Sequence, residues 1–149
     1  MLELLYRTYR VIMYRRALSV LGDHALAEDA VHEAFIRISR HIGRFEQIST
    51  DEHRYLCLTI VKNAALNMLR DRGVTEELPG DIHAPGDISL GIDIADAINS
   101  LEEGHQQVVM LRIRYGFSTI ETARLLGIRP GTVTSRLTRA RKILISKLK

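Results

Sequence analysis

The stretch STIETARLLGIRPGTVTSRL, residues 118–137, has the spacing of two short helices joined by a tight turn. A capping box over residues 118–121 predicts the start of a helix that ends at Gly127, which supplies the positive φ of the turn. The small Ala123 lets the two helices cross closely. Pro130 opens the second helix, because its missing N–H has no intrahelical partner in a first turn. The stretch therefore predicts a helix-turn-helix.

The second helix of this motif has an apolar side and a polar side. Val133, Leu137, Ala140 and Leu144 recur at helical spacing and are expected to be buried. The opposite side is expected to carry Thr132, Arg136 and Arg139, flanked by Thr134, Ser135 and Thr138. Arginine contacts guanine or phosphate through two parallel hydrogen bonds, and short hydroxyls reach phosphates or base edges. The pattern favours a DNA-reading helix, and a plain helical hairpin with a charged face is the alternative.

Charge is spread unevenly along the 149 residues. The formal net charge is +3, yet residues 124–149 contain eight basic residues and no acidic one. Such a concentration of positive charge at one end of a chain favours a polyanionic partner, with a solvated helix face as the alternative.

The composition excludes several classes of protein. The hydrophobic fraction of 46% is too high for a disordered chain, and no apolar run approaches the ~20 residues needed to span a bilayer. We expect no signal peptide and no membrane insertion, and the single Cys57 excludes an internal disulfide, which indicates the reducing cytoplasm.

Motifs for catalysis or cofactor binding are not found in the sequence. There is no Gly-rich phosphate loop or Gly-x-Ser-x-Gly sequence, and none of the six histidines pairs with another at i, i+4. The cluster of Glu28, Asp29, His32 and Glu33 is interpreted as a charged helix surface rather than a metal or acid–base site. We therefore expect no cofactor, no metal and no enzymatic activity.

The segment 73–91 differs from the sequence on both sides of it. It contains four of the ten glycines, two of the three prolines, four acidic residues and no basic one. This composition predicts a flexible acidic linker between two small helical domains, residues 1–72 and 92–149.

Elsewhere the apolar residues follow a helical period, so the fold is expected to be all-α. Three helices are predicted in the first domain: residues 2–21, ending at Gly22; a helix through Leu26, capped by Asp23 and stopped at Gly43; and a helix from the capping box at 49–52 to about residue 72. Four are predicted in the second: near 92–101, near 103–115 with a stop at Gly116, and the two helices of the helix-turn-helix.

A polar stripe is predicted along the third helix of the first domain. At 100° per residue, Thr59, Asn63, Asn67 and Arg70 fall opposite the apolar arc, with Lys62 at the edge. Hydrogen-bonding side chains in a row suit contact with exposed bases and with the nucleic-acid backbone. The alternative is that these asparagines simply face water.

Three segments carry a resemblance to a known family. LAEDAVHEAF (26–35) resembles the core of region 2 in sigma factors of the extracytoplasmic-function group, and IVKNAALNMLR (60–70) resembles the end of that region. GFSTIETARLLGI (116–128) followed by GTVTSRLTRAR (131–141) is similar to region 4. Three motifs in the family's order are far more specific than any one of them. The chain departs from the family pattern in several places: His32 stands where glutamine is usual, Leu56 near the position where tryptophan is common, and Glu102 where proline is common.

The resemblance implies a bacterial transcription initiation factor that binds core RNA polymerase, recognises −35 and −10 promoter elements and promotes local DNA opening. It implies three sets of site residues. The −35 set is Arg129, Thr132, Thr134, Ser135, Arg136, Thr138 and Arg139; the −10 set is Lys62, Asn63, Asn67 and Arg70; the polymerase set is Asp29, His32, Glu33 and Phe35. An anti-sigma factor is implied as a further partner. A stand-alone helix-turn-helix regulator that binds an operator without polymerase, and a protein–protein adapter, are the alternatives.

Overall fold

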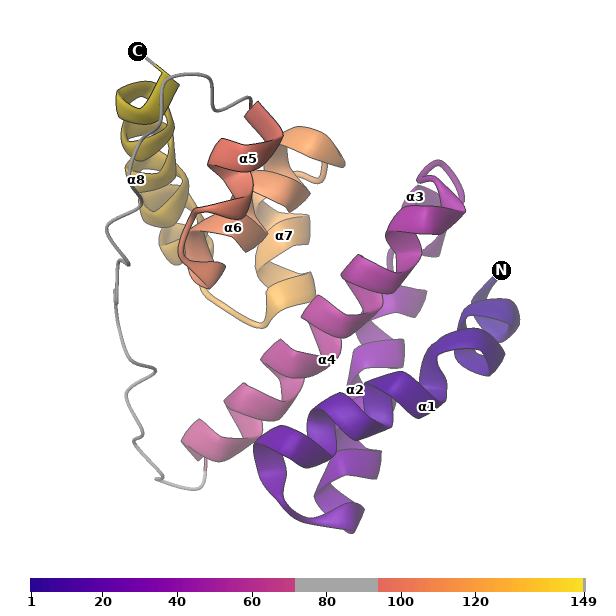
Figure 1. Ribbon diagram of the computed structural model, residues 1–149. Coiled ribbons are helices and arrows are strands. Elements are labelled where there is room, and N and C mark those ends of the chain that lie inside the picture. The colour runs from indigo at the N-terminus through magenta and orange to yellow at the C-terminus, as the bar shows by residue number, and fades with distance from the viewer. Residues whose placement is uncertain (72–93, 149) are drawn as a thin grey trace. The chain divides into compact units, whose positions relative to one another are not determined.

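The computed structural model describes residues 1–71 and 94–148, and all regular structure within these ranges is helical (Figure 1). The described residues form two compact units. One contains α1 to α4, and the other contains α5, α6, the π-helical segment η1, most of α7, and α8. The prediction of an all-α fold is confirmed, whereas the predicted linker at 73–91 lies outside the described residues.

In the first unit, α1 (Leu2–Leu21) packs on both α2 (His24–Ser39) and α4 (Thr50–Asp71), and α2 also packs on α4 (Figure 1). The short α3 (Ile42–Phe45) lies between α2 and α4 in the chain. Small and branched side chains with no exposed surface fill the space between the three long helices: Met13, Ala17, Ala27, Ala30, Ala34, Ile38, Leu56 and Ile60.

The predicted turn between α1 and α2 is confirmed. Gly22 has a φ of 66°, and its N–H donates to the carbonyl of Leu18 at 2.8 Å. The Asp23 carboxylate accepts a 3.0 Å hydrogen bond from the N–H of Leu26, so it caps the first turn of α2 as expected. A left-handed glycine followed at once by an N-cap reverses the chain within two residues.

The predicted stop at Gly43 is wrong. α2 already ends at Ser39, and Gly43 lies inside α3 without a positive φ, so the first unit has four helices rather than three. The reason is tertiary. Phe45, at the end of α3, is fully buried, and the ring Nε2–H of buried His53 on α4 donates to the Phe45 carbonyl at 2.8 Å.

The second unit contains α5 (Ile94–Asn99), α6 (Glu103–Val109), η1 (Met110–Arg114), α7 (Thr119–Leu126) and α8 (Pro130–Leu148). The predicted helix over 103–115 has the expected extent, with Gly116 at a φ of 73°, but its last five residues are π-helical.

A side-chain bond closes the end of this π-helical segment. Nη1 of Arg112 donates to the carbonyl of Phe117 at 2.8 Å, and the Phe117 side chain is fully buried. Short π-helical turns occur inside α-helices, and the spacing of apolar residues in the sequence does not reveal them.

No helix within residues 1–71 and 94–148 combines the length and the apolar character needed to cross a membrane.

Two glycines of the first unit allow a matched test of backbone strain. A Cβ added at Gly22 or at Gly43 would meet nothing within 4 Å, but only Gly22 has a positive φ. We expect Gly22→Ala to lower the free energy of unfolding by about 1–2 kcal/mol, because an L residue is strained in the left-handed region. Gly43→Ala should raise it by about 0.5–1 kcal/mol, because alanine loses less conformational entropy in a helix. Thermal unfolding followed by circular dichroism measures both, and equal effects would contradict this account of the turn.

Candidate nucleic-acid interface

The helix-turn-helix is formed by α7 and α8 of the second unit. The predicted capping box at its start is present: the N–H of Ser118 donates to Glu121 Oε1 at 2.9 Å, and the N–H of Glu121 donates to Ser118 Oγ at 3.1 Å. Gly127 has a φ of 67°, and Pro130 is the first residue of α8. Ala123 is buried, as are Val133, Leu137 and Ala140 along α8, so the predicted apolar stripe is confirmed over these residues. Leu144, also predicted to be buried, is half-exposed.

The solvent-facing side of α8 differs slightly from the expected one. Arg129, Thr134, Ser135, Thr138 and Arg139 are exposed, whereas Thr132 and Arg136 are only half-exposed. The exposed side is therefore centred nearer Ser135 and Thr138, and Arg136 lies on its flank. The three exposed hydroxyls donate to carbonyls one turn earlier on α8: Thr134 to Pro130 at 3.2 Å, Ser135 to Thr132 at 3.3 Å, and Thr138 to Thr134 at 2.9 Å. Their oxygen lone pairs consequently face outward as acceptors.

Arg136 lies against the first turn of α6. A Cβ built on Gly104 would stand 3.5 Å from Cζ and Nη1 of Arg136 and 3.3 Å from Oε1 of Glu102. The guanidinium and the carboxylate thus converge on the space that Gly104 leaves open. Oε2 of Glu102 also lies 3.7 Å from Nδ1 of buried His105. The expectation that Arg136 projects directly away from the core is wrong, because α6 packs on α8 along this flank.

The candidate −10 residues all lie on α4. Arg70 is exposed, while Lys62 and Asn67 are half-exposed. Asn63 is buried, and its Nδ2 donates to the backbone carbonyl of Thr59 at 2.8 Å. Thr59 is buried as well, so the predicted polar stripe is wrong in its first half: packing inside the unit covers Thr59 and Asn63, and only Lys62, Asn67 and Arg70 reach the surface.

The candidate polymerase residues lie on α2. Asp29 and His32 are exposed, and Glu33 accepts a 3.2 Å hydrogen bond from Nε of Arg37 one turn on. Phe35 is instead buried, with the Tyr6 ring edge-on at a centroid distance of 5.1 Å. The structure brings Asp29, His32 and Glu33 to the surface and places Phe35 in the packing between α1 and α2.

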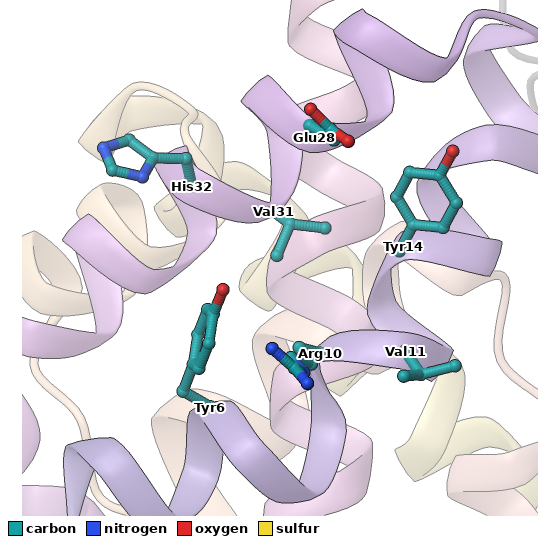
Figure 2. A pocket seen from close by; sticks show the side chains of 7 residues that line it. All are labelled: Tyr6, Arg10, Val11, Tyr14, Glu28, Val31 and His32. Carbon is teal, nitrogen blue, oxygen red and sulfur yellow. The ribbon is translucent and has the colours of Figure 1, made fainter.

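An open groove of about 500 Å³ lies between α1 and α2 beside this cluster (Figure 2). It is lined by Tyr6, Arg10, Val11 and Tyr14 from α1 and by Glu28, Val31 and His32 from α2. The Arg10 guanidinium lies 5.5 Å from the centre of the Tyr6 ring. The sequence alone does not reveal this groove, because its α1 residues follow the pattern of an ordinary amphipathic helix.

Two further side chains bear on the candidate sites. Cys57 is fully buried on α4, and burial raises the pKa of its thiol to about 12, so it is a packing residue as expected. Within residues 1–71 and 94–148, no group of three or more histidine, cysteine, aspartate or glutamate side chains is arranged to hold a metal ion.

Two family models match the chain. The model described as Sigma-70 region 2 matches residues 5–75, and the model described as Sigma-70, region 4 matches residues 92–144. The first match contains most of α1 and all of α2 to α4, and the second contains α5 to α7 and most of α8. Together they cover well over half of the chain.

Two curated relatives agree with these matches, and one solved structure is reported beside them. The chain is 29% identical over 147 residues to the ECF RNA polymerase sigma factor SigL of Mycobacterium tuberculosis, covering 92% of this chain and 82% of the relative. It is 30% identical over 145 residues to SigM of the same species, covering 92% and 71%. A structure of the sigma factor RpoE with the anti-sigma factor NepR from Bartonella quintana is 24% identical, with a TM-score of 0.40, over 96% of this chain and 93% of that one. On the family models and the curated relatives, the chain belongs to the ECF RNA polymerase sigma factors.

Proposed function

We propose that this sigma factor binds core RNA polymerase, brings it to −35 and −10 promoter elements, and promotes local opening of the DNA. The observation that carries the proposal is the presence, in one chain, of a helix-turn-helix with an exposed basic side and a second helical unit that has Lys62, Asn67 and Arg70 at the surface of α4 and an acidic cluster on α2. We assign residues 1–72 to the first domain, 73–91 to a linker and 92–149 to the second domain. The polymerase supplies the chemistry, so the chain is not itself an enzyme, and it acts in the cytoplasm.

The −35 element is read as duplex by α8. Recognition helices of this motif meet base edges with residues near their N-termini, and Arg129, Thr132, Thr134, Ser135, Arg136, Thr138 and Arg139 all belong to or adjoin the first half of α8. Arg139 is exposed and carries two outward donors suited to guanine. The outward lone pairs of Ser135 and Thr138 suit a base amino group such as that of adenine or cytosine.

The −10 element is contacted by α4 through Lys62, Asn63, Asn67 and Arg70. Lys62 and Arg70 supply positive charge for the backbone, and the two asparagines supply amide groups for unpaired bases. A long, well-packed helix fixes Lys62, Asn67 and Arg70 at its surface and the buried Asn63 beside them, which suits capture of a strand once the duplex separates.

Core polymerase docks on α2 through Asp29, His32 and Glu33. Asp29 and Glu33 are one helical turn apart on α2. Glu33 already pairs with Arg37, so a basic partner surface would bind the exposed Asp29 and share Glu33 with Arg37. Phe35 acts indirectly, because it packs under Tyr6 and fixes α1 against α2. An anti-sigma factor that covers the groove between α1 and α2 would compete for this side of the first unit; Tyr6 and Val11 are exposed there.

Polymerase binding through α2 can be tested by reversing the charge of its acidic residues. Asp29→Arg with Glu33→Arg should abolish capture by core RNA polymerase, because like charges would then face a basic surface. Asp29 is exposed, so its replacement should cost little stability. Glu33 pairs with the largely buried Arg37, so circular dichroism of the double variant checks that it is still folded. A pull-down with purified core enzyme, followed by transcription from a cognate promoter, measures the loss.

Glu3→Arg is the control for this experiment, because Glu3 is an exposed acid on α1, paired with Arg7 and not on α2. Unchanged capture of the double variant would refute the α2 assignment. A wild-type chain that binds promoter duplex but never polymerase would be a stand-alone regulator and would refute the function.

A second prediction separates base reading from phosphate contact on α8. Arg139→Ala should cost about 1–3 kcal/mol of −35 binding and relax the preference at one base pair. Lys142→Ala should weaken binding to every sequence alike and flatten the salt dependence by about one unit of slope. Competition binding against a set of single-base variants at several salt concentrations measures both effects. The reverse pattern would show that α8 enters the groove in another register.

A third prediction concerns the carboxylate beside Arg136. If Arg136 contacts DNA, Glu102 competes with phosphate or base for its guanidinium, so Glu102→Gln should tighten duplex binding. The gain should disappear in an Arg136→Ala background, with a coupling energy on the order of 0.5–3 kcal/mol. Glu103→Gln changes the net charge equally at the neighbouring exposed position and is the matched control. An equal gain from Glu103→Gln, or from Glu102→Gln without Arg136, would assign the effect to overall charge.

A further inference from the structure

A second groove, of about 250 Å³, lies between α1 and α4. It is lined by Ile12, Arg15, Arg16, Ser19, Arg54 and Leu58. Three of these six side chains are arginines that come from two helices, and no carboxylate is among them. The groove is separate from the one beside Asp29, which lies between α1 and α2.

The three arginines of this groove form no ion pair within residues 1–71 and 94–148, although Asp51 and Arg54 both act on the pKa of Tyr9. Among the described residues, no carboxylate forms an ion pair with Arg15, Arg16 or Arg54, and all three are exposed. Other arginines of the same unit are paired: Arg7 with Glu3 at 2.8 Å and Arg37 with Glu33 at 3.2 Å. A concave surface with several unpaired guanidinium groups concentrates positive potential and attracts anions.

The groove leads along α4 to a residue of the −10 set. Arg54, Leu58 and Lys62 stand at i, i+4 and i+8, so they form one row on the helix surface. At 1.5 Å per residue, Lys62 lies roughly 12 Å along the helix from Arg54. A strand that contacts Lys62 can therefore continue along the same row into the groove.

We propose that this groove binds the phosphate backbone of single-stranded DNA next to the −10 element. The inference rests on the proposed DNA-binding role of α4 and adds a contact outside the −10 set. Guanidinium groups bind phosphate oxygens through two parallel hydrogen bonds, and the apolar Ile12 and Leu58 offer a surface for a sugar or base. The continuity with Lys62 favours nucleic acid over an acidic protein. A recess of this size admits part of one strand rather than a duplex.

The test compares arginine-to-alanine variants of the 149-residue chain, inside and outside the groove. Binding of a fluorescent single-stranded oligonucleotide of mixed sequence is measured over a range of salt concentrations. Arg15→Ala with Arg16→Ala should weaken binding and lower the salt slope by about 1.4, since each phosphate contact to a single strand contributes about 0.7. Arg54→Ala should lower it by a further 0.7 or so. Arg7→Ala with Arg10→Ala removes the same charge from the same helix outside the groove and should leave the slope nearly unchanged.

Several outcomes would overturn the proposal. The first is an unchanged salt slope of oligonucleotide binding in the variant of Arg15 and Arg16. The second is an equal fall of that slope in the control variant of Arg7 and Arg10. The third is that the unaltered chain does not bind single-stranded DNA. Equal competition by poly-glutamate at matched charge would assign the groove to an acidic protein instead. Arg15→Lys with Arg16→Lys retains the positive charge, so most of the salt slope lost in the alanine variant should return. This result would show that the alanine variant lost phosphate contacts rather than its fold.

This test and the test of the proposed function can fail separately. Polymerase capture depends on α2, and −35 duplex binding depends on α8, so neither should change in the groove variants. Normal capture with an unchanged slope refutes only the groove. Absent capture with the expected fall in slope refutes only the function as a polymerase subunit.

Discussion

The close approach of α2 to its neighbours is the constraint on which the first unit depends. Ala27, Ala30 and Ala34 line the buried side of α2, and none has exposed surface. Alanine at these positions lets the backbones of α1 and α4 come near α2, and larger side chains elsewhere, such as Ile38 and Leu56, fill the remaining space. Because so much of each helix is committed to this packing, polar and charged residues remain for the outside, where they form distinct surfaces on α2, on α4 and between α1 and α4.

Neighbouring surfaces of this unit differ in charge because different helices contribute to each. The exposed acids Asp29 and Glu28 belong to α2, whereas Arg15, Arg16 and Arg54 come from α1 and α4 and have no acidic partner among the described residues. A protein that contacts polymerase and nucleic acid together has to keep such surfaces apart, since each repels the partner of the other. The packing of α1 against both α2 and α4 places Glu28 and the three arginines in two different grooves.

In the second unit, the packing of α6 on α8 determines which arginines of α8 are exposed to a DNA partner. Periodicity places Arg136 near the polar side of α8, but α6 packs along that flank, and Gly104 leaves room there for the guanidinium beside Glu102. Arg139, nearly one turn further on, is exposed. The presence of glutamate where the family commonly has proline gives Arg136 a charged neighbour at the start of α6. A residue can thus match a family motif while its side chain is engaged elsewhere in the fold.

The sequence by itself determined the all-α class, the turns at Gly22 and Gly127, the caps at Asp23 and Ser118, and the buried stripe of α8. These depend on local backbone preference and on helical periodicity, both of which are properties of neighbouring residues. Only the tertiary structure decided the features that depend on contacts between distant residues. The His53–Phe45 hydrogen bond accompanies α3 where a stop was expected, the burial of Phe35 removes it from the surface, and the position of α6 moves Arg136 to a flank. The groove formed by α1 and α4 belongs to the same group, because its arginines are 38 or more residues apart between the two helices and meet only when those helices pack.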